Sequence, residues 1–151
     1  MTASVDEIHM RGAIALARAQ VGQTGSNPAV GCVIASGESA IAEAATAQSG
    51  RPHAEEQAVA LAGAAAAGAT AYVSLEPCGE RTSGVASCAE RLIAAGIARV
   101  VYAVDNPDGR SAGQGPARLL GAGVTVEAGL LADEARDVYA EFLSPYEKGG
   151  A

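Results

Sequence analysis

The chain has 151 residues, enough for one compact domain with a substantial core, and 49% of them are hydrophobic, chiefly small aliphatic side chains. A formal net charge of −7 argues against non-specific binding to nucleic acid, which depends on Lys and Arg, and against an anionic membrane surface. Three cysteines do not make a disulfide framework, so we expect metal binding or free thiols in a reducing cytoplasm.

Hydrophobic periodicity and turn residues divide the chain into alternating helices and strands. In chain order we expect a helix over 6–21, strands over 29–35 and 40–46, a helix over 54–66, a strand over 70–76, a helix over 88–95, a strand over 99–104, a helix over 115–121, a strand over 124–129 and a helix over 131–143. This alternation predicts the α/β class, a three-layer α/β/α sandwich around one five-stranded sheet. No repeat or linker divides the chain, so we expect a single domain over 1–151 with a frayed tail over about 145–151.

Residues 58–75 carry no charge, and their length alone is compatible with a membrane span. The stretch is mostly Ala, however, and Gly63 and Gly68 interrupt it. A buried helix that leads into a buried strand fits better than a membrane segment. The first ten residues contain acids and lack the apolar region of a secretory signal, so we expect a cytoplasmic protein.

Helical spacing also predicts where single side chains lie. We expect His9 on the surface of the first helix and Glu56 as a solvated charge on the second. The apolar stripe of the second helix is expected to consist of Ala54, Ala58, Leu61, Ala62 and Ala65. Cys32 lies in the apolar run AVGCVIA, where a small buried hydrophobic residue is expected.

Three residues offer the donor set of a catalytic zinc site, which takes three nitrogen or sulfur ligands and keeps one position open. His53 can supply a nitrogen, and Cys78 and Cys88 can supply two thiolates. Cys78 follows a proline at the exit of an expected strand, and Cys88 begins an expected helix. The positive end of that helix dipole favours the thiolate form, which is the form that binds metal.

Glu55 stands two residues after His53, a separation of about 200° around a helix. The two side chains can converge only if the metal lies beyond the first turn, and Pro52 helps to fix that entry. His53 then acts as a ligand and Glu55 as an acid beside the metal's water. Zinc lowers the pKa of its water to about 7. Glu55 can accept that proton and return it to a leaving amine.

The pattern H-x-E followed by P-C-x-x-C is the signature of zinc deaminases. This chain has His53 and Glu55 in the first part and Pro77 and Cys78 in the second, but nine residues instead of two separate Cys78 from Cys88. The alternative interpretation is a histidine at a helix start and two buried free cysteines. Glu76, before Pro77, fits either a hydrogen-bonding role at the strand end or a role in the site.

Longer stretches resemble the deaminase domain of bacterial riboflavin-biosynthesis deaminase/reductases, within the cytidine deaminase-like zinc deaminase superfamily. They are NPAVGCVI (27–34), GRPHAEEQAV (50–59), GATAYVSLEPC (68–78), CAERLIAAGIARVVYAVDNP (88–107) and AGQGPARLLGAGVTVEAGLL (112–131). The resemblance implies a cytidine deaminase-like fold with a mixed sheet, a Zn²⁺ cofactor and a homodimer or higher homo-oligomer. The reductase domain that usually follows is not found within these 151 residues.

The resemblance also suggests which residues contact the substrate. Asn27 and Ala54 are expected to line the pocket, and Arg81 and Thr82 resemble a G-R-T segment whose side chains suit a phosphate or a sugar. The alternatives are turn chemistry before a proline for Asn27 and an ordinary surface loop for Arg81 and Thr82.

The expected function is therefore zinc-dependent hydrolytic deamination of a small aminopyrimidine-type nucleotide, first among them the riboflavin-pathway diaminohydroxyphosphoribosylaminopyrimidine. Glu55 would be the catalytic acid and base. Deamination of cytidine, guanine or adenosine is an alternative, as is a non-catalytic zinc-containing binding module. A nucleic-acid deaminase is disfavoured by the acidic balance and by the long segment between the cysteines.

Overall fold

A computed structural model of the chain describes residues 4–24, 28–78, 87–106 and 113–140, apart from the side chain of Ser49. In chain order its elements are α1 (Val5–Gln20), β1 (Gly31–Ser36), β2 (Ser39–Ala45), η1 (Gln48–Gly50), α2 (Ala54–Ala62), η2 (Gly63–Ala66), β3 (Thr70–Leu75), α3 (Cys88–Ala94), β4 (Arg99–Val104), α4 (Gln114–Gly121), β5 (Thr125–Ala128) and α5 (Ala132–Val138). The tail expected over 145–151 lies outside the described residues.

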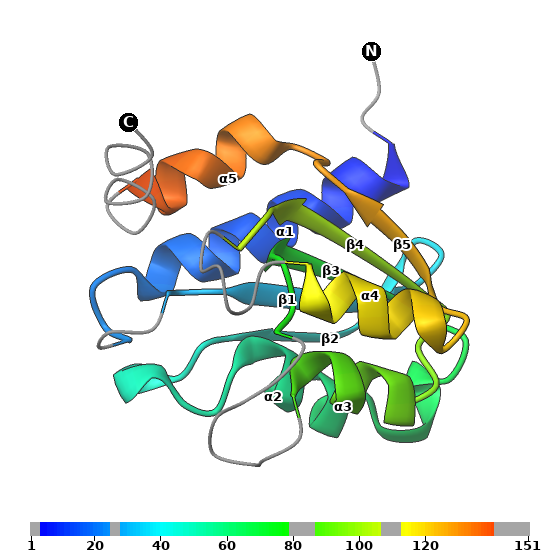
Figure 1. Cartoon of the computed structure of the whole chain (residues 1–151). Helices are drawn as coiled ribbons and strands as arrows, with labels where there is room; N and C mark the ends of the chain where they lie inside the picture. Colours follow the sequence, from blue (N-terminus) through cyan, green and yellow to red (C-terminus); the bar gives the residue numbers. More distant parts are fainter. Residues whose placement is uncertain (1–3, 25–27, 79–86, 107–112, 141–151) are drawn as a thin grey trace.

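The strands form one five-stranded sheet in the order β2-β1-β3-β4-β5. β1 pairs antiparallel with β2 and with β3, whereas β3, β4 and β5 run parallel. Helices α1 and α5 cover one face of the sheet and α2, α3 and α4 cover the other (Figure 1). The predicted α/β/α sandwich with a mixed sheet is therefore confirmed.

Small residues allow the helices to lie close to the sheet. A Cβ atom added to Gly31 would lie 1.8 Å from the carbonyl oxygen of Ala13, so the backbones of α1 and β1 are in direct contact there. α1 begins with a capping box, in which the Ser4 hydroxyl accepts the Glu7 N–H at 3.1 Å and the Glu7 carboxylate accepts the Ser4 N–H at 3.1 Å. Close backbone packing replaces the large aromatic side chains that this composition lacks.

The second expected helix is shorter than predicted, and two of the five residues predicted for its apolar stripe are exposed. α2 ends at Ala62 because Gly63 adopts a positive φ of 55°, and a short 3-10 segment follows. Ala54, Ala58 and Ala62 are buried as expected. Leu61 is 68% exposed and Ala65 is exposed too, because the helix turns only its alanine edge toward the sheet.

Two side chains expected in solvent are in fact held by tertiary partners. His9 is only 7% exposed, because its Nε2 atom lies 2.9 Å from the Gly37 carbonyl oxygen and its ring packs on Tyr72. Glu56 is largely covered, with 14% of its side chain exposed, and it pairs with Arg91 of α3 at 3.7 Å. Both expectations were wrong for the same reason: the partner lies on another element.

The uncharged stretch 58–75 runs from the second half of α2 through η2 into β3, as a helix followed by a strand. Within the described part of the chain, no helix combines the length and the apolar character that a bilayer crossing requires.

Candidate metal and active site

Three separate segments bring the predicted ligands together at one end of the sheet. His53 is the N-cap residue of α2, Cys78 follows the end of β3, and Cys88 is the first residue of α3. The start of α3 is fixed by Ser87, whose hydroxyl accepts the Glu90 N–H at 3.1 Å. His53 has extended rather than helical backbone angles, so its ring lies beyond the first turn as the sequence argument requires.

The three donor atoms lie within 4.8 Å of one another. The Nδ1 atom of His53 is 3.3 Å from the Sγ atom of Cys88. Tetrahedral zinc with ordinary bond lengths separates its nitrogen and sulfur ligands by about 3.5–3.8 Å. The geometry and the donor chemistry therefore both fit Zn²⁺ at His53, Cys78 and Cys88.

Cys78 is held in place by the first residues of α3. Its Sγ atom accepts the Cys88 N–H at 3.2 Å, and its carbonyl oxygen accepts the Ala89 N–H at 3.0 Å. Hydrogen bonds from Cys88, followed by one from His53, lower the pKa of the Cys78 thiol from 9.0 to about 4, although burial opposes them. Cys78 is thus a thiolate at neutral pH, the form that coordinates zinc.

Glu55 lies in the first turn of α2 with only 4% of its surface exposed. Burial, followed by the negative charge of Cys78, raises the pKa of its carboxyl group, while the charge of His53 and a hydrogen bond with Cys88 act in the opposite direction. The carboxyl group is therefore within electrostatic reach of the ligand set. Its raised pKa suits a group that must hold a proton during a reaction.

Two further residues near Glu55, namely Cys32 and Ala54, are fully buried. Cys32 on β1 is completely inaccessible, which confirms the expected small hydrophobic residue, and burial raises the pKa of its thiol well above the usual value, with a further contribution from Glu55. Ala54, expected at the substrate, begins α2 with its methyl group in the core. The other expected substrate residues, Asn27, Arg81 and Thr82, lie outside the described residues.

Glu76 has the hydrogen-bonding role at the strand end that was one of its two expected roles. It is 4% exposed, and its carboxylate accepts the Gly113 N–H at 2.7 Å and the Asn106 N–H at 3.4 Å. Burial raises the pKa of this carboxyl group, and these two hydrogen bonds lower it.

Gln57 is a supporting residue that the sequence argument missed. Its side-chain amide donates to the Ala45 carbonyl at 2.6 Å and to the Pro52 carbonyl at 3.1 Å, and the Ala47 N–H also donates to Pro52 at 3.1 Å. Gln57 therefore ties the end of β2 to the peptide that precedes His53. Its place two residues after Glu55 is the only signal in the sequence, and an uncharged residue in a helix does not indicate such a contact.

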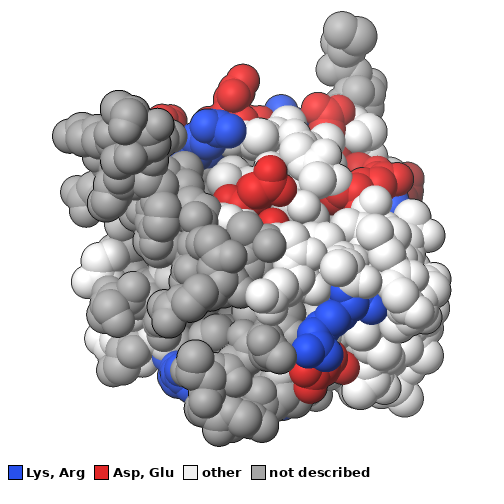
Figure 2. Space-filling view, in the orientation of Figure 1, with Lys and Arg blue, Asp and Glu red and all other residues white. Residues whose placement is uncertain are grey.

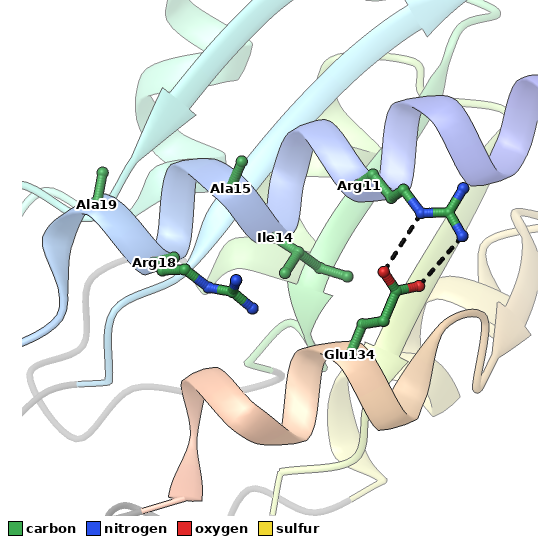
Figure 3. A pocket seen from close by; sticks show the side chains of 6 residues that line it. All are labelled: Arg11, Ile14, Ala15, Arg18, Ala19 and Glu134. Atoms are coloured by element: carbon green, nitrogen blue, oxygen red, sulfur yellow. Dashed lines mark hydrogen bonds and ion pairs between the residues drawn. The ribbon is translucent and has the colours of Figure 1, made fainter.

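A groove of about 410 Å³ lies between α1 and α5, on the opposite face of the sheet from the metal ligands (Figure 3). Ile14 forms its floor, and Arg11 on one wall pairs with Glu134 on the other at 3.3 Å. This groove contains none of the predicted site residues, so its size alone does not make it the active site. Acidic side chains gather near the α5 and β5 side of the molecule in Figure 2, in keeping with the net charge of −7.

Comparison with known proteins identifies relatives that match most of the chain. The family described as "Cytidine and deoxycytidylate deaminase zinc-binding region" matches residues 3–104. Riboflavin biosynthesis protein RibD of Escherichia coli is 42% identical over 144 residues, which are 95% of this chain and 39% of that protein. Diaminohydroxyphosphoribosylamino-pyrimidine deaminase of Buchnera aphidicola is 36% identical over 144 residues, which are 95% of this chain and 97% of that protein.

A solved structure of RibD from Acinetobacter baumannii superposes with a TM-score of 0.90 at 40% identity, covering 96% of this chain and 41% of that one. The chain thus spans about two fifths of the RibD proteins that it matches and nearly all of the Buchnera deaminase. The predicted zinc cofactor is confirmed by the family and by the His/Cys/Cys group. Together these matches show that the chain belongs to the zinc-dependent cytidine and deoxycytidylate deaminase family, alongside the riboflavin-biosynthesis deaminases.

Proposed function

We propose that this chain is a hydrolytic deaminase of diaminohydroxyphosphoribosylaminopyrimidine, with His53, Cys78 and Cys88 as zinc ligands and Glu55 as the catalytic acid and base. The observation that carries the proposal is the convergence of three ligand atoms within 4.8 Å beside a buried glutamate. The Buchnera relative supports the substrate assignment because this chain spans 97% of it.

The reaction replaces the amino group of a pyrimidine ring by an oxygen atom from water and releases ammonia. Zinc, when bound, supplies a Lewis acid that lowers the pKa of a water molecule. Glu55 accepts a proton from the attacking water and delivers it to the amino nitrogen, so that the carbon–nitrogen bond breaks with ammonia as the leaving group. The raised pKa of Glu55 helps it to retain the proton between these two transfers.

Opposite pKa shifts distinguish the two proposed roles in the site. The thiolate of Cys78 is stabilised by hydrogen bonds and remains available to the metal. The carboxyl group of Glu55 lies in a less polar environment that favours its protonated form. Two acidic groups with pKa values displaced in opposite directions are the arrangement expected where one binds a cation and the other transfers a proton.

The deciding experiment combines metal analysis with ammonia release on a panel of substrates. The purified chain is assayed with diaminohydroxyphosphoribosylaminopyrimidine, cytidine, guanine and adenosine. We expect about one zinc per chain and turnover of the first compound only. Activity on another base alone would move the chain to a different substrate, and a zinc-containing protein without any turnover would indicate a binding module.

Assembly and location are separate proposals. We infer a homodimer or higher homo-oligomer by analogy with deaminases of this fold, and sedimentation equilibrium tests it. We infer a cytoplasmic location because none of Cys32, Cys78 and Cys88 forms a disulfide, which is typical of a reducing compartment. Fractionation of cells that express the chain tests that inference.

A further inference from the structure

Cys78 belongs to a short segment that is supported on several sides. The N–H of Glu76 donates to the Val104 carbonyl at 2.8 Å and so extends the pairing of β3 with β4. The carbonyl and the thiol of Cys78 both accept hydrogen bonds from the start of α3. These contacts hold the two ends of the segment, on either side of the peptide between Pro77 and Cys78.

The first turn of α4 lies directly against that peptide. A Cβ atom added to Gly115 would be 1.9 Å from the Pro77 carbonyl oxygen and 2.9 Å from its carbon, so only a residue without a side chain fits there. A displacement of α4 toward β3 would therefore push the residue that precedes a metal ligand. A displacement away from β3 would remove the contact.

Glu76 fixes where α4 begins. The N-cap residue of α4, Gly113, has a left-handed φ of 79° and no side chain that could cap the helix. The Glu76 carboxylate instead binds the N-cap residue itself, accepting the Gly113 N–H at 2.7 Å. Its other oxygen accepts the N–H of Asn106, which follows β4, at 3.4 Å. A negative group at this helix end is also favoured by the helix dipole.

We propose that Glu76 is a positioning residue for the metal ligand Cys78, acting through the start of α4 and the contact of Gly115 with the Pro77 carbonyl. The inference rests on the proposed zinc site. The two hydrogen bonds of Glu76 would by themselves only stabilise the fold. The proposal adds that they also set the position of Cys78 relative to the metal. Removal of the carboxylate releases the first turn of α4, and the Pro77–Cys78 peptide loses its support on that side.

The test measures the metal itself rather than the reaction. Glu76→Ala and Glu76→Gln are compared with Glu43→Ala, which removes an exposed glutamate of β2. Zinc release to a chromophoric chelator is timed, and the visible absorption of the Co²⁺-substituted protein reports the ligand geometry. We expect Glu76→Ala to release zinc about tenfold faster than the unchanged chain and to shift the cobalt bands. Glu76→Gln should lie between the two because its amide oxygen still accepts one N–H.

A purely structural role for Glu76 predicts a different result. Glu76→Ala would then lower the melting temperature but leave the zinc release rate and the cobalt spectrum as in Glu43→Ala, and that result overturns the proposal. An unchanged chain that binds no zinc would overturn the proposed function and this inference together. An unchanged chain that binds zinc normally, with Glu76 variants that match it, overturns only the inference.

A second pair of variants covers the case in which Glu76→Ala does not fold. Gly115→Ala places a methyl group against the Pro77 carbonyl, whereas Gly121→Ala places one at the other end of α4, where no atom lies within 4 Å. We expect faster zinc release and a shifted cobalt spectrum in Gly115→Ala alone. A folded Gly115→Ala protein that behaves like Gly121→Ala contradicts the proposal.

Discussion

Glu55 and Glu56 are neighbours in the chain but face different surroundings. Glu55 is buried beside the ligand set, and the pKa of its carboxyl group is raised by burial and by the charge of Cys78. Glu56 points to α3 and pairs with Arg91 at 3.7 Å. The pair therefore offers a test of the catalytic assignment in which the control differs by a single position.

We expect Glu55→Gln to lower kcat by a factor of about 10²–10⁴, the usual contribution of a general acid and base, with zinc content unchanged. Gln keeps the size of the side chain but cannot carry the proton. Glu56→Gln should retain nearly full activity. Ammonia release and metal analysis on the same preparations check both, and an active Glu55→Gln enzyme would disprove the assignment.

Asp6 provides a pH-dependent contribution to stability. Hydrogen bonds from Arg99, and more weakly from Tyr72, lower the pKa of its carboxyl group from 3.8 to about 2. The ionised form is favoured in the folded state, so the contribution is complete above pH 4 and is lost as the pH falls toward 2.

Because Asp6 lies near the surface, we expect Asp6→Asn to cost about 1 kcal/mol at neutral pH. The gap in melting temperature between this variant and the unchanged chain should narrow as the pH is lowered from 5 to 3. Thermal unfolding across this range measures it, with the exposed Asp137→Asn as the control. A gap that widens at low pH would contradict the sign of the pKa shift.

The convergence of the three proposed ligands could be predicted from the sequence, whereas the residues that support them could not. His53, Cys78 and Cys88 carry distinctive chemistry, and each stands at an element boundary that turn residues and apolar runs indicate. His9 and Gln57 are held by residues that are 28 and 12 positions away, so no local pattern reveals them.

At the scale of elements, the contact of α1 with β1 depends on the absence of one side chain. We expect Gly31→Ala to destabilise the fold by about 3 kcal/mol or more, because its Cβ atom would overlap the Ala13 carbonyl. Gly121→Ala, in open space on α4, should be neutral or slightly stabilising through helix propensity. Urea unfolding of the two variants separates steric overlap from a general effect of the substitution, and equal stabilities would contradict the packing argument.

Strands were easier to place than helix faces. The expected strand over 99–104 matches β4 residue for residue, because Val and Tyr, which favour strands, make up most of a run that Gly and Pro residues flank in the sequence. In α2 the many alanines are compatible with more than one buried face, so the sequence pattern could not exclude Leu61 from the core. Gly63 then ends the helix earlier than its alanine content suggests.

At the scale of the molecule, the metal would join three segments that the sheet holds only in part. His53 precedes α2, Cys78 follows β3 and Cys88 begins α3, so a shared ion links two helices to the centre of the sheet. We expect removal of zinc by a chelator to lower the melting temperature and restoration of zinc to raise it, since an ion that binds only the folded state stabilises it by mass action.

Scanning calorimetry with and without chelator measures this effect. Cys78→Ser serves as the comparison, because it lacks one thiolate and should respond little to either treatment. Equal responses of the two proteins would show that the stabilising ion binds elsewhere.

The layered architecture follows from the alternation of strands and helices, and its prediction was correct. The order of the strands is a different matter. β1 lies between β2 and β3, and the parallel half of the sheet begins only at β3. That order is set by pairing between strands that are distant in the chain, such as Cys32 with Val73, which no local sequence pattern indicates.

The hydrogen bonds between Cys78 and the start of α3 close the base of the segment that separates the two cysteines. Closure at the base holds Cys78 and Cys88 close together although nine residues separate them in the sequence. Doubling the length of such a loop costs only about 0.6 kcal/mol in closure entropy. Additional residues between the two cysteines are therefore expected to cost little stability, provided that Ser87 still caps α3.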